Sequence, residues 1–576
     1  MAANSKGLDE KMAGQILAVC NRLAGSSRVT ASCVYGQGGF ESRDSKTPVE
    51  VLLVVYGFQP RLMSYVSIID GRNVFVLAVD QWVFERDVDR GFLGEALAWV
   101  LIFPNLPLIN SEYLRDQEVK LKKRLVTEIL ENLVLDFPEL SYELFIKPEY
   151  FMYEVMISRA RLFPPMTYSF WSFMQKDRGK KEACHMLHGY SEALASLAKK
   201  GLICFSEEYV RMTEEFVAGV HSPRTRLVNL SKTVPRTLFT SLLGVLPKVL
   251  DILSQNRESL VNFQRILDRS TMQFQTEVPK NYLYVPTASG LVPLTNKMGI
   301  EEFARTVLAA DKNAKISVEA LGGILNDVYL IRALLDGKEQ KVVVKRFKDW
   351  SSFKWFPLTL WSIGTRTFAV LGRPRLEREC ATNQLLYSKG FSVPKLLHVS
   401  PDKRLVFMEY VEGKDVSAVI KQLAGAKNSA KVKRELRIIE RVGWKIAKVH
   451  ALGIALGDTK PENIMIGKHG EIYLMDFEQS SRGGDKVWDV AEFLYYAGHD
   501  LPPFVETQRI GLIAEAFVNG YLRAGGKLDI VRKAANPKYT KVFSIFTLPH
   551  VMLAISNVCR RAENVRNRVW LRTRQL

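Results

Sequence analysis

The chain has few cysteines and no long uninterrupted hydrophobic run. Its six cysteines include no CxxC pair, so no disulfide-stapled secreted framework is indicated and the thiols fit a reducing compartment. The longest uncharged stretch, residues 96–111, is broken by Pro104 and Pro107 and is too short to cross a bilayer. Residues 1–15 are polar and mixed in charge, unlike a signal peptide. We therefore expect a cytoplasmic protein without a transmembrane segment.

Acidic residues are scarce relative to basic ones. Among 576 residues, 80 lysines and arginines stand against 61 aspartates and glutamates, a net charge of +19. A field of this sign favours polyanionic partners, nucleic acid first and an acidic membrane surface second. The hydrophobic fraction of 47% is ordinary for globular proteins. The length fits about three domains.

Positive charge is concentrated at the end of the chain, where six arginines surround Trp570 and accompany a single acid, Glu563. Arginines around an aromatic ring suit phosphate contacts and base stacking, which favours RNA as a partner. A solvated terminal helix that keeps the protein soluble is the alternative, and both interpretations stay open. The arginines are Arg560, Arg561, Arg566, Arg568, Arg572 and Arg574.

Residues 1–110 have the composition of a small α/β domain. A helix is expected at 9–23, and the runs 49–56 and 74–79 are apolar and rich in β-branched residues, which is typical of strands. A glycine-rich turn at 36–39 precedes the first strand.

This order resembles a degraded nucleotidyltransferase signature. Such enzymes need two carboxylates two residues apart, because alternate residues on a strand face the same magnesium ions. Glu50 has Leu52 two residues on, so the second acid is missing. Asp80, at the end of the next strand, is either a third ligand or a turn former. We expect a nucleotidyltransferase-like shape without catalysis, with an unrelated α/β domain as the alternative.

Helical periodicity dominates residues 111–275. The runs 119–135 and 181–199 carry apolar residues at three-to-four spacing among charges. A third amphipathic segment, 236–253, either touches a membrane surface or packs against its own domain, and we expect the latter. Residues 276–315 are proline-containing and predict a linker and lead-in to a further domain.

The most informative segment lies near residue 460. Asp458 is followed by Lys460 two residues on and by Asn463 five residues on, and Asp476 begins the sequence Asp-Phe-Glu. The intervening residues 464–475 contain two strand-like runs around a glycine turn and predict a β-hairpin. A hairpin places Asn463 and Asp476 at neighbouring strand ends, where both face one metal ion.

This pattern resembles the catalytic loop and metal-binding segment of the protein kinase superfamily, in its eukaryotic-type and atypical branches. Phosphoryl transfer requires mainly positioning and charge neutralisation. The resemblance implies that Asp458 accepts or orients the proton of the attacking hydroxyl and that Lys460 holds the transferring phosphoryl group. It also implies ATP as cofactor, with Mg²⁺ or Mn²⁺ bound through oxygen by Asn463 and Asp476.

Further pieces of the resemblance lie upstream in the expected order. Lys345 ends an apolar run and would contact the α- and β-phosphates. Gly322 and Gly323 would form a shortened phosphate loop, because glycines let backbone amides approach an anion. Glu379 is implied as the helix carboxylate that pairs with Lys345. Glu377 lies about 200° away around a helix, so both cannot face that lysine.

The run 408–413 resembles the kinase hinge, where backbone groups of Glu409 and Val411 would bind adenine. An insert at 350–361 carries three of the nine tryptophans. Tryptophan is favoured in binding hot spots, so this insert is either a docking surface or, as we expect, a cover packed within the same chain.

Two features favour an atypical branch. Ten residues separate Glu478 from Asp489 and no Ala-Pro-Glu motif follows, so the long segment that docks peptides in ordinary protein kinases is missing. This compactness is similar to the Rio-type kinases and to the kinase of the KEOPS tRNA-modification complex. The latter also ends in a basic tail, which adds to the RNA interpretation. Lys460 favours protein serine or threonine hydroxyls as acceptors over small molecules.

Glu478 departs from the superfamily pattern, since it replaces the glycine of Asp-Phe-Gly. It adds a carboxylate beside the metal ligand and removes backbone freedom. It either coordinates a second cation or points to solvent, and we expect solvent. All the groups that do chemistry are present, so we expect an active enzyme.

The sequence thus predicts an α+β multidomain chain with a bilobal, protein-kinase-like domain at 316–576. The expected function is an ATP- and Mg²⁺-dependent phosphotransferase of atypical serine/threonine protein kinase type, acting on a protein substrate. The alternatives are an ATPase or assembly factor associated with tRNA or ribosomal RNA, a small-molecule phosphotransferase, and a non-catalytic scaffold.

Overall fold

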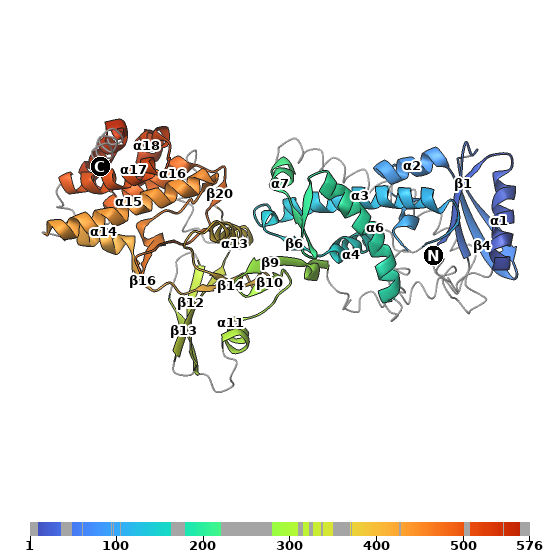
Figure 1. Ribbon diagram of the computed structural model, residues 1–576, viewed down its shortest axis with the longest axis horizontal. Coiled ribbons are helices and arrows are strands. Elements are labelled where there is room, and N and C mark those ends of the chain that lie inside the picture. Colours follow the sequence, from blue (N-terminus) through green and yellow to red (C-terminus); the bar gives the residue numbers. More distant parts are fainter. Residues whose placement is uncertain are drawn as a thin grey trace. The chain divides into compact units, whose positions relative to one another are not determined.

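The computed structural model divides into two compact units, Met1–Leu283 and Tyr284–Leu576 (Figure 1). Both are of mixed α/β composition. The division of the first unit into 1–110 and 111–275 stays a prediction. The structure describes residues 10–35, 49–59, 61–93, 95, 97–103, 105–162, 179–220, 279–308, 315–321, 326–335, 338–348, 369, 371–425, 428–499, 501, 507–544 and 547–564.

A five-stranded sheet of order β3-β4-β2-β1-β5 organises the start of the first unit. β2 and β4 are parallel and the other neighbours are antiparallel. The predicted helix and both predicted strands are confirmed as α1, β2 and β4, and α1 buries Met12, Ile16 and Cys20 in the same core as β2. The elements are α1 (Glu10–Ala24), β1 (Val29–Tyr35), β2 (Val49–Val55), β3 (Leu62–Ile69), β4 (Arg72–Asp80), α2 (Gln81–Arg90), η2 (Ala98–Leu101) and β5 (Asn105–Ile109).

Asp80 ends β4 and caps α2. One carboxylate oxygen accepts the backbone N–H of Trp82 at 3.1 Å, and the other accepts that of Phe58 at 3.0 Å. Backbone donors therefore bind both oxygens, which makes Asp80 a turn-forming and capping residue. Of the two predicted roles, the structure supports this one.

Helices dominate the rest of the first unit, and the predicted helices at 119–135 and 181–199 are confirmed within α3 and α6. The ammonium of buried Lys122 on α3 donates to Glu118 at 2.6 Å and to the carbonyl of Met186 on α6 at 3.0 Å. The segment 236–253 lies outside the described residues. The elements are α3 (Ser111–Asp136), η3 (Leu140–Tyr142), β6 (Phe145–Ile146), α4 (Pro148–Leu162), α6 (Gly179–Lys199), β7 (Ile203–Ser206), β8 (Tyr209–Met212), α7 (Glu214–Val220) and η5 (Pro279–Tyr282).

The second unit begins with a strand-rich part. Its antiparallel sheet has the order β11-β12-β13-β15-β14 and is accompanied by helix α13 (Figure 1). A hairpin of β9 and β10 precedes it. The elements are β9 (Leu283–Thr287), β10 (Gly290–Pro293), α11 (Ile300–Phe303), η6 (Ala304–Leu308), β11 (Lys315–Ala320), β12 (Asn326–Leu335), β13 (Lys338–Phe347), α13 (Gly372–Ser388), β14 (Leu396–Ser400) and β15 (Leu405–Glu409).

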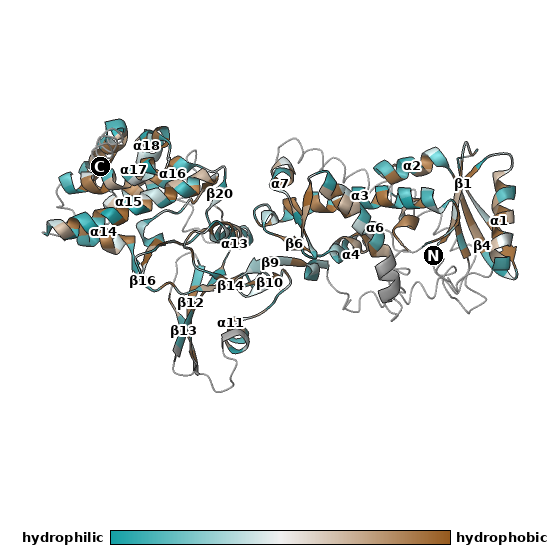
Figure 2. Ribbon diagram, in the orientation of Figure 1, coloured by the Kyte–Doolittle hydropathy of each residue, from teal (hydrophilic) through white to brown (hydrophobic). Residues whose placement is uncertain are grey.

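A helix-rich part follows, and hydrophilic and hydrophobic residues alternate along α14, α15 and α17 (Figure 2). α15 buries the predicted stripe Ile439, Val442, Ile446 and Val449. The elements are β16 (Gly413–Asp415), α14 (Val416–Gly425), α15 (Ser429–Ala451), β17 (Ile454–Ala455), η8 (Pro461–Asn463), β18 (Ile464–Gly467), β19 (Ile472–Leu474), β20 (Ser481–Arg482), α16 (Lys486–His499), α17 (Thr507–Arg523), α18 (Leu528–Lys533), α19 (Pro537–Phe543) and α20 (Pro549–Arg560).

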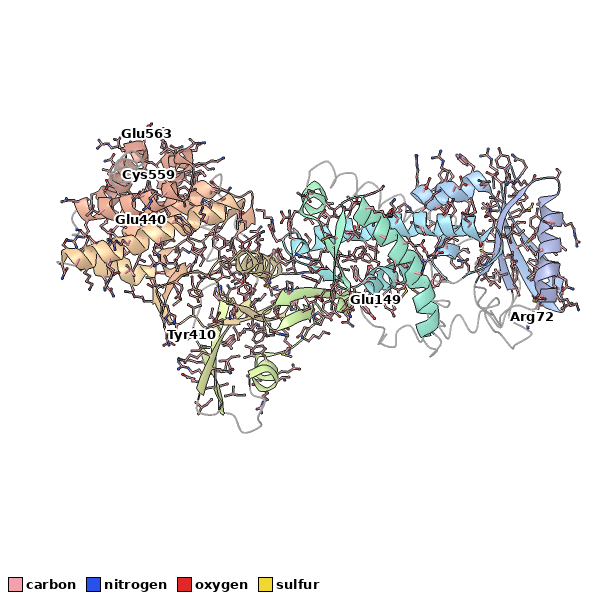
Figure 3. All side chains as sticks on the ribbon, in the orientation of Figure 1. Arg72, Glu149, Tyr410, Glu440, Cys559 and Glu563 are labelled. Carbon is pink, nitrogen blue, oxygen red and sulfur yellow. The ribbon has the colours of Figure 1, made fainter. Side chains whose placement is uncertain are left out.

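α15 and α17 approach each other closely at two glycines. A Cβ atom at Gly520 on α17 would overlap the backbone carbonyl of Glu440 on α15. Glu440 is labelled in Figure 3. A Cβ atom at Gly443 would overlap the carbonyl of Phe517 in the same way. In each contact the backbone of one helix meets the backbone of the other, and helix backbone cannot move aside as a flexible side chain can.

Substitution of Gly520 by alanine is therefore expected to lower the free energy of unfolding of the second unit by about 2–3 kcal/mol. Gly511 lies on the same helix, and apart from its chain neighbours and the backbone of its own helix no heavy atom lies within 4 Å of the position of a Cβ. Gly511→Ala is therefore expected to raise the free energy of unfolding by about 0.5–1 kcal/mol through helix propensity. Urea unfolding followed by circular dichroism measures both. Equal effects of the two substitutions would contradict this packing.

Candidate active site

The loop that contains Asp458 is fixed by a buried carboxylate on α16. Asp489 accepts the backbone N–H groups of Leu456 at 2.6 Å and Gly457 at 2.7 Å, and it contacts His450 Nε2 at 2.9 Å. One turn further along α16, Glu492 accepts the backbone N–H of Thr459 at 2.8 Å. The two carboxylates anchor the loop on both sides of Asp458.

Asp458 and Lys460 form an ion pair within this loop. Lys460 Nζ lies 3.1 Å from Asp458 Oδ1 and 5.3 Å from the centre of the Tyr496 ring. Burial alone would lower the pKa of Lys460, but the charges of Asp458 and Glu492 outweigh it and raise the pKa above its usual value. Lys460 therefore remains a cation beside the Asp458 carboxylate at neutral pH.

Asn463 and Asp476 lie at the ends of neighbouring strands, as the predicted hairpin requires. β18 and β19 are antiparallel, and the N–H of Met475 donates to the carbonyl of Asn463 at 3.0 Å. The side-chain amide nitrogen of Asn463 donates to the carbonyl of Asp458 at 3.1 Å. This bond turns the amide oxygen of Asn463, the atom that a hard cation prefers, to the opposite side.

Lys345, on β13 of the strand-rich part, lies beside Asp476. Its ammonium lies 3.2 Å from Asp476 Oδ1 and 3.6 Å from Glu379 Oε2. Glu379 also accepts the backbone N–H of Phe477 at 2.8 Å. Glu377 contacts Arg373 at 3.4 Å instead, so Glu379 is the carboxylate of α13 beside this lysine.

The charges in this cluster are unbalanced. Burial would lower the pKa of Lys345, but the nearby Asp476 and Glu379 raise it overall. Burial raises the pKa of Glu379, and its attraction to Lys345 compensates only in part because Asp476 and Glu478 repel its charge. One ammonium thus serves two carboxylates. The surplus negative charge favours the binding of a cation.

The prediction that Glu478 points to solvent is wrong. Its side chain is buried, and Arg375 Nη2 donates to its two oxygens at 2.7 and 2.8 Å. Asn326 Nδ2 donates to Glu478 Oε2 at 2.6 Å. A cationic partner compensates the buried carboxylate, so the charge need not reach water. The guanidinium and amide donors occupy both oxygens, which also disfavours the alternative of a second bound cation.

The proposed adenine contacts lie where the strand-rich part meets the helix-rich part, near Tyr410, which is labelled in Figure 3. Glu409 ends β15, and its N–H donates to the carbonyl of Lys395 at 2.9 Å. Because this N–H is already bonded, the predicted backbone contact of Glu409 with adenine would be made by its carbonyl group. Val411 lies two residues after Glu409 and is buried.

Several predicted features lie outside the described residues. They are Gly322 and Gly323 of the phosphate loop, the insert at 350–361, and Arg566, Arg568, Trp570, Arg572 and Arg574 of the basic tail. The described tail residues Arg560 and Arg561 are exposed at the end of α20.

No three His, Cys, Asp or Glu side chains gather into a metal site in the described part of the chain. Mg²⁺ needs no such cage in nucleotide sites, where one or two protein ligands act with phosphate oxygens. The Asp476 carboxylate and the Asn463 amide fit that donor set. The helices whose residues are described include none long and apolar enough to cross a bilayer.

A cavity of about 880 Å³ opens elsewhere in the strand-rich part. Its lining mixes both signs of charge, with Glu301, Asp327, Arg346, Lys348 and Arg404 among its residues. It includes none of the candidate residues Lys345, Glu379, Asp458, Asn463 and Asp476. The ion-pair cluster, and not this cavity, marks the candidate site.

The model of the lipopolysaccharide kinase (Kdo/WaaP) family matches residues 339–493. This family is an atypical kinase family of the protein-kinase-like type. The matched segment runs from β13 into α16 and contains Lys345, Glu379, Asp458, Asn463 and Asp476. No curated protein matches the chain.

The match supports a phosphotransferase of atypical kinase type for the second unit. A closer likeness to Rio-type kinases or to the KEOPS kinase stays a prediction, as do the roles assigned to single residues. No pattern in the sequence signalled the roles of Arg375, Asn326 and Glu492, and Asp489 entered the prediction only as the end of a spacing. The resemblance of the loop around Asp458 to a kinase catalytic loop was the available signal. Such a loop needs anchoring, and the acidic residues of the next helix, α16, were candidates to anchor it.

Replacement of Asp489 by asparagine is expected to lower the free energy of unfolding of the second unit by about 2–4 kcal/mol. An amide nitrogen would then face one of the N–H groups that the carboxylate now accepts. Asp529, which is 69% exposed, provides the matched control, and Asp529→Asn is expected to change stability by less than about 0.5 kcal/mol. Urea unfolding measures both. An Asp489→Asn protein as stable as the control would show that the loop is held otherwise.

Proposed function

We propose that the second unit transfers the γ-phosphoryl group of Mg²⁺-bound ATP to a hydroxyl group. The observation that carries this proposal is the position of Lys345 between Glu379 and Asp476. Met475, the residue before Asp476, is bonded to Asn463, and the Asn463 side chain is bonded in turn to Asp458. Phosphoryl transfer depends on placing one lysine, one metal-binding carboxylate and one hydroxyl-orienting carboxylate around the same triphosphate. These groups come from three segments of the chain.

Each residue has a role that its surroundings support. The Lys345 cation would contact the α- and β-phosphates, while Glu379 holds its ammonium in place. Asp476 and Asn463 would bind Mg²⁺ or Mn²⁺, which neutralises charge on the phosphates. Asp458 accepts or orients the proton of the attacking hydroxyl, and Lys460, which pairs with Asp458, would hold the transferring phosphoryl group.

The acceptor we favour is a sugar hydroxyl, because the matched family is named for lipopolysaccharide and phosphorylates sugars. The connection between Glu478 and α16 supports this choice. It is short, and its strand β20 pairs with β17 before α16 begins. Ordinary protein kinases place a longer peptide-docking segment there, so this site suits a compact acceptor.

A serine or threonine hydroxyl of a protein is the second candidate. Lys460, whose ammonium lies 3.1 Å from the Asp458 carboxylate, is the residue that favours it. A lysine two residues after the catalytic aspartate is the pattern of the serine/threonine kinases that this loop resembles.

Asp458→Asn is expected to lower kcat for phosphoryl transfer at least about 100-fold, because the asparagine amide cannot accept the hydroxyl proton. The Kd for Mg²⁺-bound ATP is expected to stay within about threefold of the unmodified protein. Asp402→Asn is the control, since Asp402 is 50% exposed and pairs with Lys297 rather than with a residue of the candidate site. Retained transfer by the Asp458 variant would remove this residue from the mechanism.

The acceptor class is tested with γ-labelled ATP and the full-length protein. The reaction is offered lipopolysaccharide core oligosaccharide in one tube and a mixed serine/threonine protein substrate in another. Label on the oligosaccharide is the expected result, and label on protein alone would favour the second candidate. ATP hydrolysis without transfer to either acceptor would contradict both.

A further inference from the structure

Three consecutive side chains after Phe477 are each bound to α13 or to the residue shortly before it. Glu478 accepts two hydrogen bonds from Arg375. The side-chain amide of Gln479 both accepts from and donates to the backbone of Ala369, at 3.0 and 3.2 Å. The hydroxyl of Ser480 lies 2.6 Å from that of Thr382. All three side chains are no more than 3% exposed.

Arg375 is the centre of this network and is completely buried. Besides Glu478, its guanidinium donates to the side-chain oxygen of Asn326 at 2.7 Å and to the carbonyl of Lys348 at 3.0 Å. Asn326 begins β12, and Lys348 directly follows β13. Arg375 therefore joins α13, the starting residue of β12, the end of β13 and the segment after Phe477.

Stability alone is a weak explanation for such a pair. Removing two charges from water is costly, and apolar residues of the same volume often stabilise a core as well or better. What such a charge-assisted pair does provide is a defined geometry, because Nη2 of Arg375 lies within hydrogen-bond distance of both carboxylate oxygens of Glu478. The position of Glu478 makes that geometry relevant, because Asp476 lies only two residues before it.

The backbone of Asp476 itself needs support. Its φ of +63° is in the left-handed region, which costs free energy in a residue with a side chain and persists only where the surroundings hold it. On one side of this turn, Met475 is bonded to Asn463, and on the other Phe477 is bonded to Glu379. The Glu478–Arg375 pair fixes the chain immediately beyond.

We propose that Glu478 and Arg375 are positioning residues that hold Asp476 beside Lys345 in the arrangement needed for phosphoryl transfer. The proposal rests on the phosphotransferase function above. Where the superfamily has a glycine with backbone freedom, this chain has a buried ion pair that permits one conformation. The pair makes the site permanently assembled, without a loop modification to order it.

The test uses the full-length protein with four variants: Glu478→Gln, Arg375→Met, the two combined, and Arg373→Met as a control on the same helix. Arg373 is 52% exposed and pairs with Glu377. Each protein is measured for kcat and for KM with ATP, for Tm, and for Mn²⁺ binding in the presence of a non-hydrolysable ATP analogue by electron paramagnetic resonance.

Each single variant is expected to lower kcat by about 10- to 100-fold with a smaller change in KM, because Asp476 is displaced slightly while most nucleotide contacts remain. Each single variant leaves one uncompensated buried charge and is expected to lower Tm by about 5 °C or more. The combined variant has neither charge, so Tm is expected to recover while kcat stays low. Mn²⁺ stoichiometry is expected to stay unchanged throughout, and the Arg373 variant to behave as the unmodified protein.

Recovery of kcat together with Tm in the combined variant would overturn the proposal, because the pair would then serve stability alone. Loss of one bound Mn²⁺ in Glu478→Gln would also overturn it, since Glu478 would be a metal ligand. An unmodified protein that binds Mn²⁺ and nucleotide but transfers no phosphoryl group would instead count against the proposed function.

Discussion

The ion pair of Lys345 with Asp476 and Glu379 is the interaction on which the candidate site depends. It joins a strand of the sheet, the helix α13 and the segment after β19, three pieces that are distant in sequence. Without the lysine, the buried carboxylate of Glu379 and the partly buried carboxylate of Asp476 would have no cation between them, which is costly. The same lysine gives the cluster its function, since it is the cation that would receive the phosphates.

Around this pair, buried carboxylates repeatedly organise the backbone. Glu379 accepts the N–H of Phe477, and Asp489 accepts two N–H groups of the loop before Asp458. The first unit uses the same device, where buried Asp87 accepts N–H groups of Leu93, Glu95, Leu97 and Ala98. A carboxylate that collects several backbone donors can fix an irregular loop that has no regular hydrogen-bond ladder of its own.

The features that sequence predicted well were those with local patterns. The hairpin between Asn463 and Asp476 follows from two strand-like runs around glycines, and the choice of Glu379 over Glu377 follows from helical periodicity. The error at Glu478 has the opposite origin, because its partner Arg375 lies 103 residues earlier in the chain. A carboxylate with no partner nearby in the sequence is expected to be exposed. No local pattern near Arg375 or Asn326 indicates that folding brings these two residues to Glu478. The strands of the first unit were predictable for the same local reasons, and so was the turn at Asp80, whose bond to Trp82 spans two residues. The bond of Asp80 to Phe58 spans 22 residues and has no local signal.

The most direct test of this account is calorimetric titration of the full-length protein with a non-hydrolysable ATP analogue. The account predicts one binding site that requires Mg²⁺ and that weakens at least about tenfold, or about 1.4 kcal/mol, in Asp476→Asn and in Lys345→Met. Binding that is indifferent to Mg²⁺ and to both substitutions would contradict it, because the nucleotide would then lie outside the cluster that these side chains form.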